Sequence, residues 1–366
     1  MSVLAVIGIL ALLIFVHELG HFMAARLQGI HVNRFSIGFG PILWKFQGPE
    51  TEYALRAIPL GGFVGFPDDD PDSEIPPEDP DLLRNRPVLD RAIVISAGVI
   101  ANMIFAYLVF VLQFGSLGVP NLNPGVLVPK VYESSPAEAA GLQTDDIILA
   151  VDQKELGSGE LARRKLMNTI QASQDEAVTL TVQRDGTEKD ISVTPRLSPD
   201  TGNAIIGVAL SPNAVLNDEG NIVFRSPRNP VELLTIAAQE FQMQTTTVAQ
   251  GMASLFTNFS SMAGQVGSPV KIVEQGAGLA NDDIRFLFPF AAIISINLAI
   301  INILPLPALD GGQLAFLIIE ALRGKPLPMR IQESVMQTGI FLLLGLGIYL
   351  IVRDTTQLEV LQNLRQ

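Results

Sequence analysis

Four long runs of apolar residues dominate the hydropathy pattern of the chain. They cover residues 1–27, 91–118, 284–322 and 335–352. A helix needs about 20 apolar residues to cross the hydrocarbon core of a bilayer. The first run could instead be a signal peptide, but it has no basic start and continues unbroken into His17 and the polar residues beyond it. The pattern therefore predicts four transmembrane helices.

The third run is too long for one simple crossing. It contains Pro305 and Pro307 near its middle, and proline interrupts the hydrogen-bond ladder of a helix. A broken helix at membrane depth is tolerated where the freed backbone groups line protein or water. We therefore expect this span to bend or unwind at the two prolines.

The polar segments between the runs predict the remaining parts of the fold. Residues 28–66 alternate between apolar and polar side chains, which predicts a β-hairpin region close to the membrane. Residues 67–90 are acidic and proline-rich; they lack the spacing of an EF-hand calcium loop, so a solvated linker is expected. Residues 121–212 predict one α+β domain, and residues 228–265 predict an amphipathic helix too polar to cross the membrane.

Composition supports a membrane protein with some soluble mass. Hydrophobic residues make up 48% of the 366 residues and charged residues 17%, against about 25% charged in soluble domains. The chain has no cysteine, which excludes disulfides, thiolate nucleophiles and cysteine-ligated metals. A net charge of −13 and a pI near 4.7 argue against a nucleic-acid partner.

The sequence HELGH, residues 17–21, is the strongest chemical signal in the chain. Residues four apart share one face of a helix, so His17 and His21 could both reach one zinc ion. Glu18 could then act as general base toward the attacking water. The pattern also occurs by chance, but here it lies at the end of an apolar span, where ionisable groups are costly and usually functional. His31 lies beyond the helix and is interpreted as an ordinary residue.

A catalytic zinc site needs a third protein ligand. Asp310 is the only acidic residue between Arg285 and Glu320, and it follows the two prolines of the third apolar run. It is the candidate ligand, although it could simply cap a helix. Asn302 could donate a hydrogen bond to the scissile carbonyl, or could instead bond to a neighbouring helix.

The two motifs together resemble those of the site-2 protease family, the intramembrane zinc metalloproteases of the bacterial regulator-of-sigma-E protease type, peptidase family M50. The family pattern is HExxH followed by NxxPxPxLDG, and residues 302–311 supply the second part. The resemblance implies that His17, His21 and Asp310 bind Zn²⁺, that Glu18 is the catalytic base and that Asn302 contacts the substrate backbone.

The resemblance extends to the other segments. Residues 28–66 resemble the membrane-associated β-hairpin region of the family, and residues 121–212 resemble a bacterial PDZ domain. Ile206 and Gly207 would then belong to the peptide-binding loop of that domain. The expected fold is a polytopic α-helical membrane protein with about four transmembrane helices, this β-hairpin region and one extracytoplasmic α+β PDZ domain.

The implied function is cleavage of transmembrane segments in single-span membrane proteins, as in regulated intramembrane proteolysis of anti-sigma factors or removal of remnant signal peptides. The PDZ groove would bind a peptide terminus, and the location would be the inner membrane of a bacterium. A non-proteolytic zinc-binding scaffold acting through the PDZ domain is the alternative, although a structural zinc site needs no general base such as Glu18. A metal transporter would instead spread its ligands over several spans.

Overall fold

The computed structural model describes residues 2–70, 73–198, 202–257 and 267–357. The chain divides into two compact units. Unit 1 comprises Met1–Ser116 together with Arg228–Gln366, and unit 2 is the segment Leu117–Pro227 between them. Each unit is built around its own apolar core, so each is described by itself.

Unit 1 contains the helices that the hydropathy pattern predicts. In the part of the chain that the structure describes, four stretches of helix are long and apolar enough to cross a membrane, with mean hydropathy between 2.2 and 2.4. These stretches are Ser2–Leu27, Val88–Leu117, Ile284–Ile303 and Met329–Thr356. They belong to α1 (Ser2–Leu27), α2 (Val88–Leu117), α8 (Leu287–Ile303) and α10 (Met329–Gln357). The expectation of about four transmembrane helices is confirmed.

The third apolar run breaks at its two prolines. Helix α8 ends at Ile303, and α9 (Asp310–Arg323) begins after a short loop in which Ala308 has a left-handed φ of 71°. The loop folds tightly back on the start of α9. A Cβ atom on Gly311 would lie 2.2 Å from the carbonyl oxygen of Leu304. Glycine is therefore required there, since any side chain would force the loop away from the helix.

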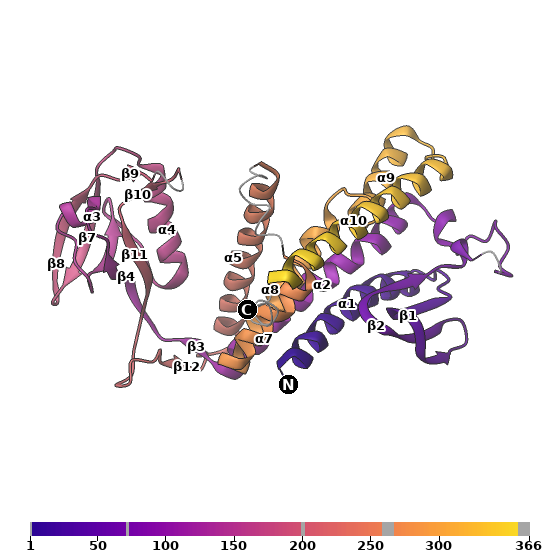
Figure 1. The fold of residues 1–366 in the computed structure, drawn as a ribbon, viewed down its shortest axis with the longest axis horizontal. Coiled ribbons are helices and arrows are strands. Elements are labelled where there is room, and N and C mark those ends of the chain that lie inside the picture. The colour runs from indigo at the N-terminus through magenta and orange to yellow at the C-terminus, as the bar shows by residue number, and fades with distance from the viewer. Residues whose placement is uncertain (1, 71–72, 199–201, 258–266, 358–366) are drawn as a thin grey trace. The chain divides into compact units, whose positions relative to one another are not determined.

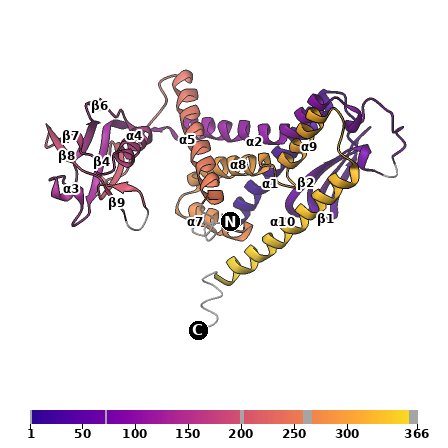
Figure 2. The ribbon, with the colours of Figure 1, turned by 90° about the horizontal axis from the view of Figure 1, so that it is seen from above.

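The β-hairpin region is formed by β1 (Arg34–Gln47) and β2 (Glu52–Gly65). The first residues of β1, Arg34–Ile37, pair with both ends of β2, so the two strands fold back on one another. The hairpin lies beside α1 (Figures 1 and 2). Phe35 is buried there, with its ring centroid 5.2 Å from that of Phe22 on α1. Packing against α1 thus fixes the hairpin relative to the HELGH motif.

Two further helices of unit 1 lie among the described residues. Helix α5 (Pro230–Thr257) lies next to α2, where the Tyr107 hydroxyl donates a hydrogen bond to the carbonyl of Leu234. The predicted amphipathic helix over 228–265 extends past α5, and its residues 258–265 lie outside the described ones. Helix α7 (Pro269–Asp282) packs so closely that a Cβ on Gly276 would lie 2.7 Å from the Phe290 ring of α8.

Unit 2 is a β-sheet flanked by helices. The strand order is β11-β4-β5-β7-β8, with β6 (Lys154–Glu155) beside β5. The sheet strands are β4 (Leu122–Val131), β5 (Ile147–Val151), β7 (Val178–Arg184), β8 (Thr187–Val193) and β11 (Val208–Ala214). The helices are α3 (Pro136–Ala139) and α4 (Gly159–Ala172). Two short two-stranded ribbons lie outside this sheet. In one, β3 (Val119–Pro120) pairs with β12 (Phe224–Arg225), and in the other, β9 (Arg196–Leu197) pairs with β10 (Ala204–Ile205). Strand β11 is thus an edge strand of the sheet.

A buried ion pair fixes one corner of unit 2. The Asp146 side chain is fully buried, and Arg184 of β7 donates to its two oxygens over 2.6 and 2.7 Å. Burial alone would raise the pKa of Asp146. The hydrogen bonds from Arg184 and from the Gln143 backbone N–H outweigh that effect and hold the pKa below its ordinary value.

We expect Asp146→Asn to lower the free energy of unfolding of unit 2 near neutral pH by about 2 kcal/mol, because the half-buried Arg184 guanidinium loses its charged partner. Since folding depresses the pKa of Asp146, the ion pair stabilises the fold above the unfolded-state pKa and loses its effect as the pH falls through the folded-state pKa. The difference in the free energy of unfolding between wild type and variant should therefore decrease as the pH is lowered. Hydrogen exchange of the β5 and β7 amides measures it. The neighbouring exposed Asp145→Asn is the control, and a pH-independent difference would contradict the assignment.

Candidate active site

The two histidines of the HELGH motif lie on one face of α1 with their rings side by side. The Nε2 atoms of His17 and His21 are 3.3 Å apart, and the ring planes are nearly perpendicular. His17 is 8% exposed in a helix whose other buried residues are apolar. The i, i+4 spacing therefore gives the geometry that the sequence predicts.

Asp310 lies beside these histidines in the structure, although it follows them by at least 289 residues in the sequence. Its Oδ2 lies 3.2 Å from His17 Nε2 and 3.4 Å from His21 Nε2. Asp310 is the first residue of α9, but the N-cap is Leu309 and makes no side-chain capping bond. The carboxylate therefore faces the histidines rather than capping its own helix.

These three atoms fit a tetrahedral zinc ion. Zinc binds nitrogen and oxygen at about 2.0–2.2 Å, so two ligands of a tetrahedron lie about 3.3–3.5 Å apart. The three separations among His17 Nε2, His21 Nε2 and Asp310 Oδ2 are 3.2, 3.3 and 3.4 Å. Asp310 Oδ2 is buried and accepts no hydrogen bond from any described residue. Three electron-pair donors that converge in this way suit a cation.

Residues of helix α2 surround the two histidine rings. This role of α2 was not predicted from the sequence. His21 Nδ1 lies 2.8 Å from the carbonyl oxygen of Val94. A Cβ on Gly98 would lie 2.3 Å from His21 Nε2, so only glycine leaves room for the ring. Asn102 lies one further turn along and faces His17. The only sequence signal is the run of small or polar residues Gly98, Asn102 and Ala106, spaced four apart in a mostly apolar helix.

Glu18 lies between the metal-ligand group and the β-hairpin. A Cβ on Gly62 of β2 would lie 2.8 Å from its Cγ, so the strand approaches the Glu18 side chain closely. Asn302, in the last turn of α8, has its Nδ2 3.2 Å from His17 Nε2. The structure thus gathers Glu18 and Asn302 around the three candidate ligands.

An ion pair holds α9 in place near the other end of that helix. Arg91 of α2 donates two hydrogen bonds to the Glu320 carboxylate, one of them over 3.1 Å, and both side chains are largely buried. Glu320 lies ten residues after Asp310 on the same helix. The pair therefore ties α2 and α9 together beyond the metal-ligand group.

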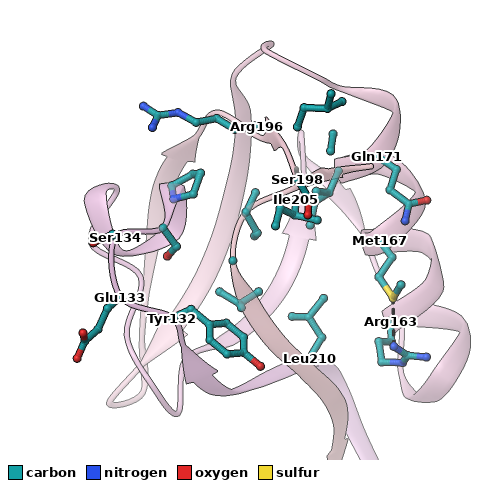
Figure 3. A pocket seen from close by; sticks show the side chains of 18 residues that line it. Tyr132, Glu133, Ser134, Arg163, Met167, Gln171, Arg196, Ser198, Ile205 and Leu210 are labelled. Atoms are coloured by element: carbon teal, nitrogen blue, oxygen red, sulfur yellow. Dashed lines mark hydrogen bonds between the residues drawn. The ribbon is translucent and has the colours of Figure 1, made fainter. Parts of the chain in front are cut away.

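The remaining two predicted residues lie in unit 2. Ile206 is buried in the core of the unit, and its carbonyl accepts a hydrogen bond from Ala137. Gly207 has a φ of 77°, and a Cβ there would lie 2.3 Å from Ser135. Both residues line a cavity of 580 Å³ between β11 and α4. Figure 3 shows Tyr132 and Leu210 on one side of it and Arg163 and Met167 of α4 on the other.

A second group of potential ligands among the described residues comprises His31, Asp79 and Asp81. Its members already have charged partners. Arg86 donates to Asp81 Oδ1 over 2.7 Å, and His31 Nε2 lies 3.8 Å from Asp79 Oδ1. This arrangement is an ion-pair network at the edge of unit 1, in keeping with the ordinary role expected for His31.

Comparison with known proteins identifies the family. The model of peptidase family M50 matches residues 5–346. The chain belongs to peptidase family M50. It is 58% identical over 363 residues to a protein of Nostoc sp. that is named as a zinc metalloprotease, covering 98% of this chain and 97% of that one. It is 48% identical to the chloroplastic membrane metalloprotease ARASP of Arabidopsis thaliana, covering 99% of this chain and 80% of that protein.

Among solved structures, PDZ domains are similar to part of the chain. The PDZ domain of an SdrC-like protein of Listeria monocytogenes matches with a TM-score of 0.22 and 20% identity, covering 25% of this chain and 93% of that domain. The family match and the four apolar helices make the chain a multi-pass membrane zinc metalloprotease of family M50. The predicted family and zinc cofactor are confirmed, and so is a fold of four apolar helices with a separate β-rich domain.

We expect Gly98→Ala to reduce zinc binding sharply, because the added methyl group would overlap the His21 ring. Metal analysis of the purified protein should show well below one zinc per chain. Gly115→Ala on the same helix is the matched control, since its Cβ meets only a Leu233 methyl group at 3.6 Å. Equal zinc content in the two variants would show that α2 does not constrain the histidines.

Proposed function

We propose that this M50 protease hydrolyses peptide bonds within or beside the transmembrane segment of single-span membrane proteins. The observation that carries the proposal is the place of the metal-ligand group. His17 and His21 lie on the first apolar helix, and Asp310 follows directly on the third. A site assembled from the spans themselves is suited to a peptide bond at membrane depth.

In this proposal each residue has a defined part in the hydrolysis. His17, His21 and Asp310 hold the zinc ion. Bound zinc supplies a Lewis acid that lowers the pKa of water to about 7 and polarises the scissile carbonyl. Glu18 takes a proton from the attacking water as the C–O bond forms, and returns it to the leaving nitrogen as the C–N bond breaks.

Asn302 is proposed to position the substrate carbonyl. Its Nδ2 lies 3.2 Å from His17 Nε2, at the edge of the metal-ligand group. Once that nitrogen holds the metal, the amide N–H can donate to the carbonyl oxygen, where negative charge develops during attack. The same amide could thus orient the bond and stabilise the transition state.

The substrate must be extended before it can react, because a helix shields its own carbonyls. Strand β2 passes Glu18 at Gly62, where the absence of a side chain lets the backbone come close. An extended segment that adds to the β1–β2 hairpin, between Ser36 and Val64, would lie along the ligand group. Strand addition is therefore the proposed way of holding the unwound segment.

The PDZ-like domain is proposed to bind a peptide terminus. The cavity beside β11 is open along an edge strand, which can pair with one more strand. Apolar residues such as Met167 and Leu210 line it, so an apolar terminal residue would fit. The groove could recruit a substrate end or exclude one that is still attached to a bulky domain.

The proposed location is the inner membrane of a bacterium with the PDZ-like domain outside the cytoplasm. The short loop between α9 and α10 carries Lys325 and is flanked by Arg323 at the end of α9 and Arg330 at the start of α10, which favours the cytoplasmic side for that loop. The proposed substrates are membrane-bound anti-sigma factors or remnant signal peptides. The acidic chain speaks against a nucleic-acid partner.

Replacing Glu18 with glutamine should separate metal binding from catalysis. We expect Glu18→Gln to retain about one zinc per chain but to cleave a single-span reporter at least 100-fold more slowly, because the general base is lost. A chelator-treated wild-type sample is the control. Cleavage at the wild-type rate would remove Glu18 from the mechanism. Stoichiometric zinc without cleavage of any helix-unstable reporter by wild type would favour the scaffold.

Asp310→Ala should lower zinc content and cleavage together, since it removes the third ligand. The exposed Asp282→Ala, which lies just before the same broken span, serves as the control and should match wild type. Zinc is measured by metal analysis and cleavage with the same reporter. Wild-type values of both in Asp310→Ala would rule out a ligand role for Asp310.

A further inference from the structure

A buried asparagine of α2 faces one of the proposed metal ligands. Asn102 is fully buried, and its amide Nδ2 lies 3.2 Å from His17 Nδ1. Its Oδ1 is also buried and has no hydrogen-bond partner among the described residues. An unpaired amide oxygen inside a membrane span is costly. Apolar packing alone therefore does not explain why an asparagine occupies position 102.

The hydrogen bonds around His17 also require that one neighbouring side-chain amide be turned over. Both ring nitrogens of His17 face an amide nitrogen, Nδ1 toward Asn102 and Nε2 toward Asn302, each over 3.2 Å. A neutral imidazole carries one N–H and one lone pair, so it cannot accept hydrogen bonds at both positions. At least one of the two amides must present its oxygen to the ring.

The metal-ligand geometry decides which amide that is. His17 Nε2 points at His21 Nε2 and Asp310 Oδ2, so a metal held by the three residues needs the lone pair of Nε2. The proton of the ring is then on Nδ1 and requires an acceptor. A half-turn of the Asn102 amide exchanges Nδ2 for Oδ1. That exchange gives the orphaned oxygen a partner and removes the donor–donor conflict.

We propose that Asn102 is a positioning residue that accepts a hydrogen bond from His17 Nδ1–H and so fixes the tautomer in which Nε2 binds zinc. The inference rests on the proposed role of His17 as a ligand. His21 has the equivalent arrangement with the Val94 carbonyl, 2.8 Å from its Nδ1. Val94 and Asn102 are eight residues apart on α2, on either side of Gly98, whose missing side chain leaves room for the His21 ring.

The position of Asn102 is itself fixed by the neighbouring span. Its backbone carbonyl accepts a hydrogen bond of 2.8 Å from the Ser295 hydroxyl of α8, and Ser295 is fully buried. Helix α8 leads directly into the loop before Asp310. One bond thus aligns the helix that orients His17 with the helix that delivers the carboxylate ligand.

Cobalt binding to the purified full-length protein tests the proposal, because Co²⁺ reports both affinity and ligand geometry in its visible spectrum. Asn102→Leu has a similar shape but no acceptor, and should weaken Co²⁺ binding 10- to 100-fold, the usual effect of removing such a partner from a histidine ligand. Asn102→Asp can only accept, so it should bind Co²⁺ within a few-fold of wild type and with the same spectrum.

The Asp variant separates the two possible roles of the amide. If Asn102 instead donated its N–H to His17, Asn102→Asp would place an acceptor against an acceptor and Co²⁺ affinity would fall, which would overturn the proposal. Wild-type affinity and spectrum in a folded Asn102→Leu would also overturn it. Should the Leu variant not fold, the Asp comparison still decides.

Two controls keep this result distinct from the proposed function. Ser116→Ala removes a hydroxyl of α2 that bonds only to carbonyls of its own helix, so Co²⁺ affinity should change less than threefold. His17→Ala should abolish the cobalt spectrum. If His17→Ala kept the wild-type spectrum, the ligand assignment itself would be wrong. Loss in His17→Ala without loss in Asn102→Leu would reject the role of Asn102 alone.

Discussion

The cost of placing ionisable groups in a membrane governs the whole of unit 1. Each such group costs about 3 kcal/mol or more at the centre of a bilayer unless it has a partner. In the structure, ionisable side chains from distant parts of the chain lie together, which reduces this cost. His17, His21 and Asp310 converge within 3.4 Å of one another, and Arg91 pairs with Glu320. The helices must therefore pack in a way that brings these polar side chains together.

Close backbone packing makes the convergence possible. Glycines occupy the places where helices or loops approach the site, as at Gly98 against the histidines and at Gly311 against the loop before α9. The break between α8 and α9 then places Asp310 at the start of a helix, directed at the ligand group. A continuous third span would carry the carboxylate past the histidines, so the two prolines are as necessary to the site as the ligands.

The sequence was sufficient for the parts of the fold that depend on local pattern. Apolar run length predicted the spans, proline predicted the break after Ile303, and the i, i+4 spacing predicted the paired histidines. The pairing of Arg34–Ile37 with both ends of β2 could not be predicted, because it depends on how the strands curve against α1. Nor could the role of α2, since Gly98 and Asn102 resemble ordinary packing residues until the histidines are placed beside them. The roles of the ligands, of Glu18 and of Asn302 stay predictions that the variants test.

The separation of the ligands along the chain has a consequence for biosynthesis. His17 leaves the ribosome early, whereas Asp310 follows about 290 residues later, which takes about 15–60 s at 5–20 residues per second. During that interval the first span holds its histidines and Glu18 without the third ligand. A nascent chain therefore cannot assemble the complete ligand set until almost the whole protein, including unit 2, has been made. Under the proposed ligand assignment, proteolytic competence is in this way delayed until unit 2 has been synthesised.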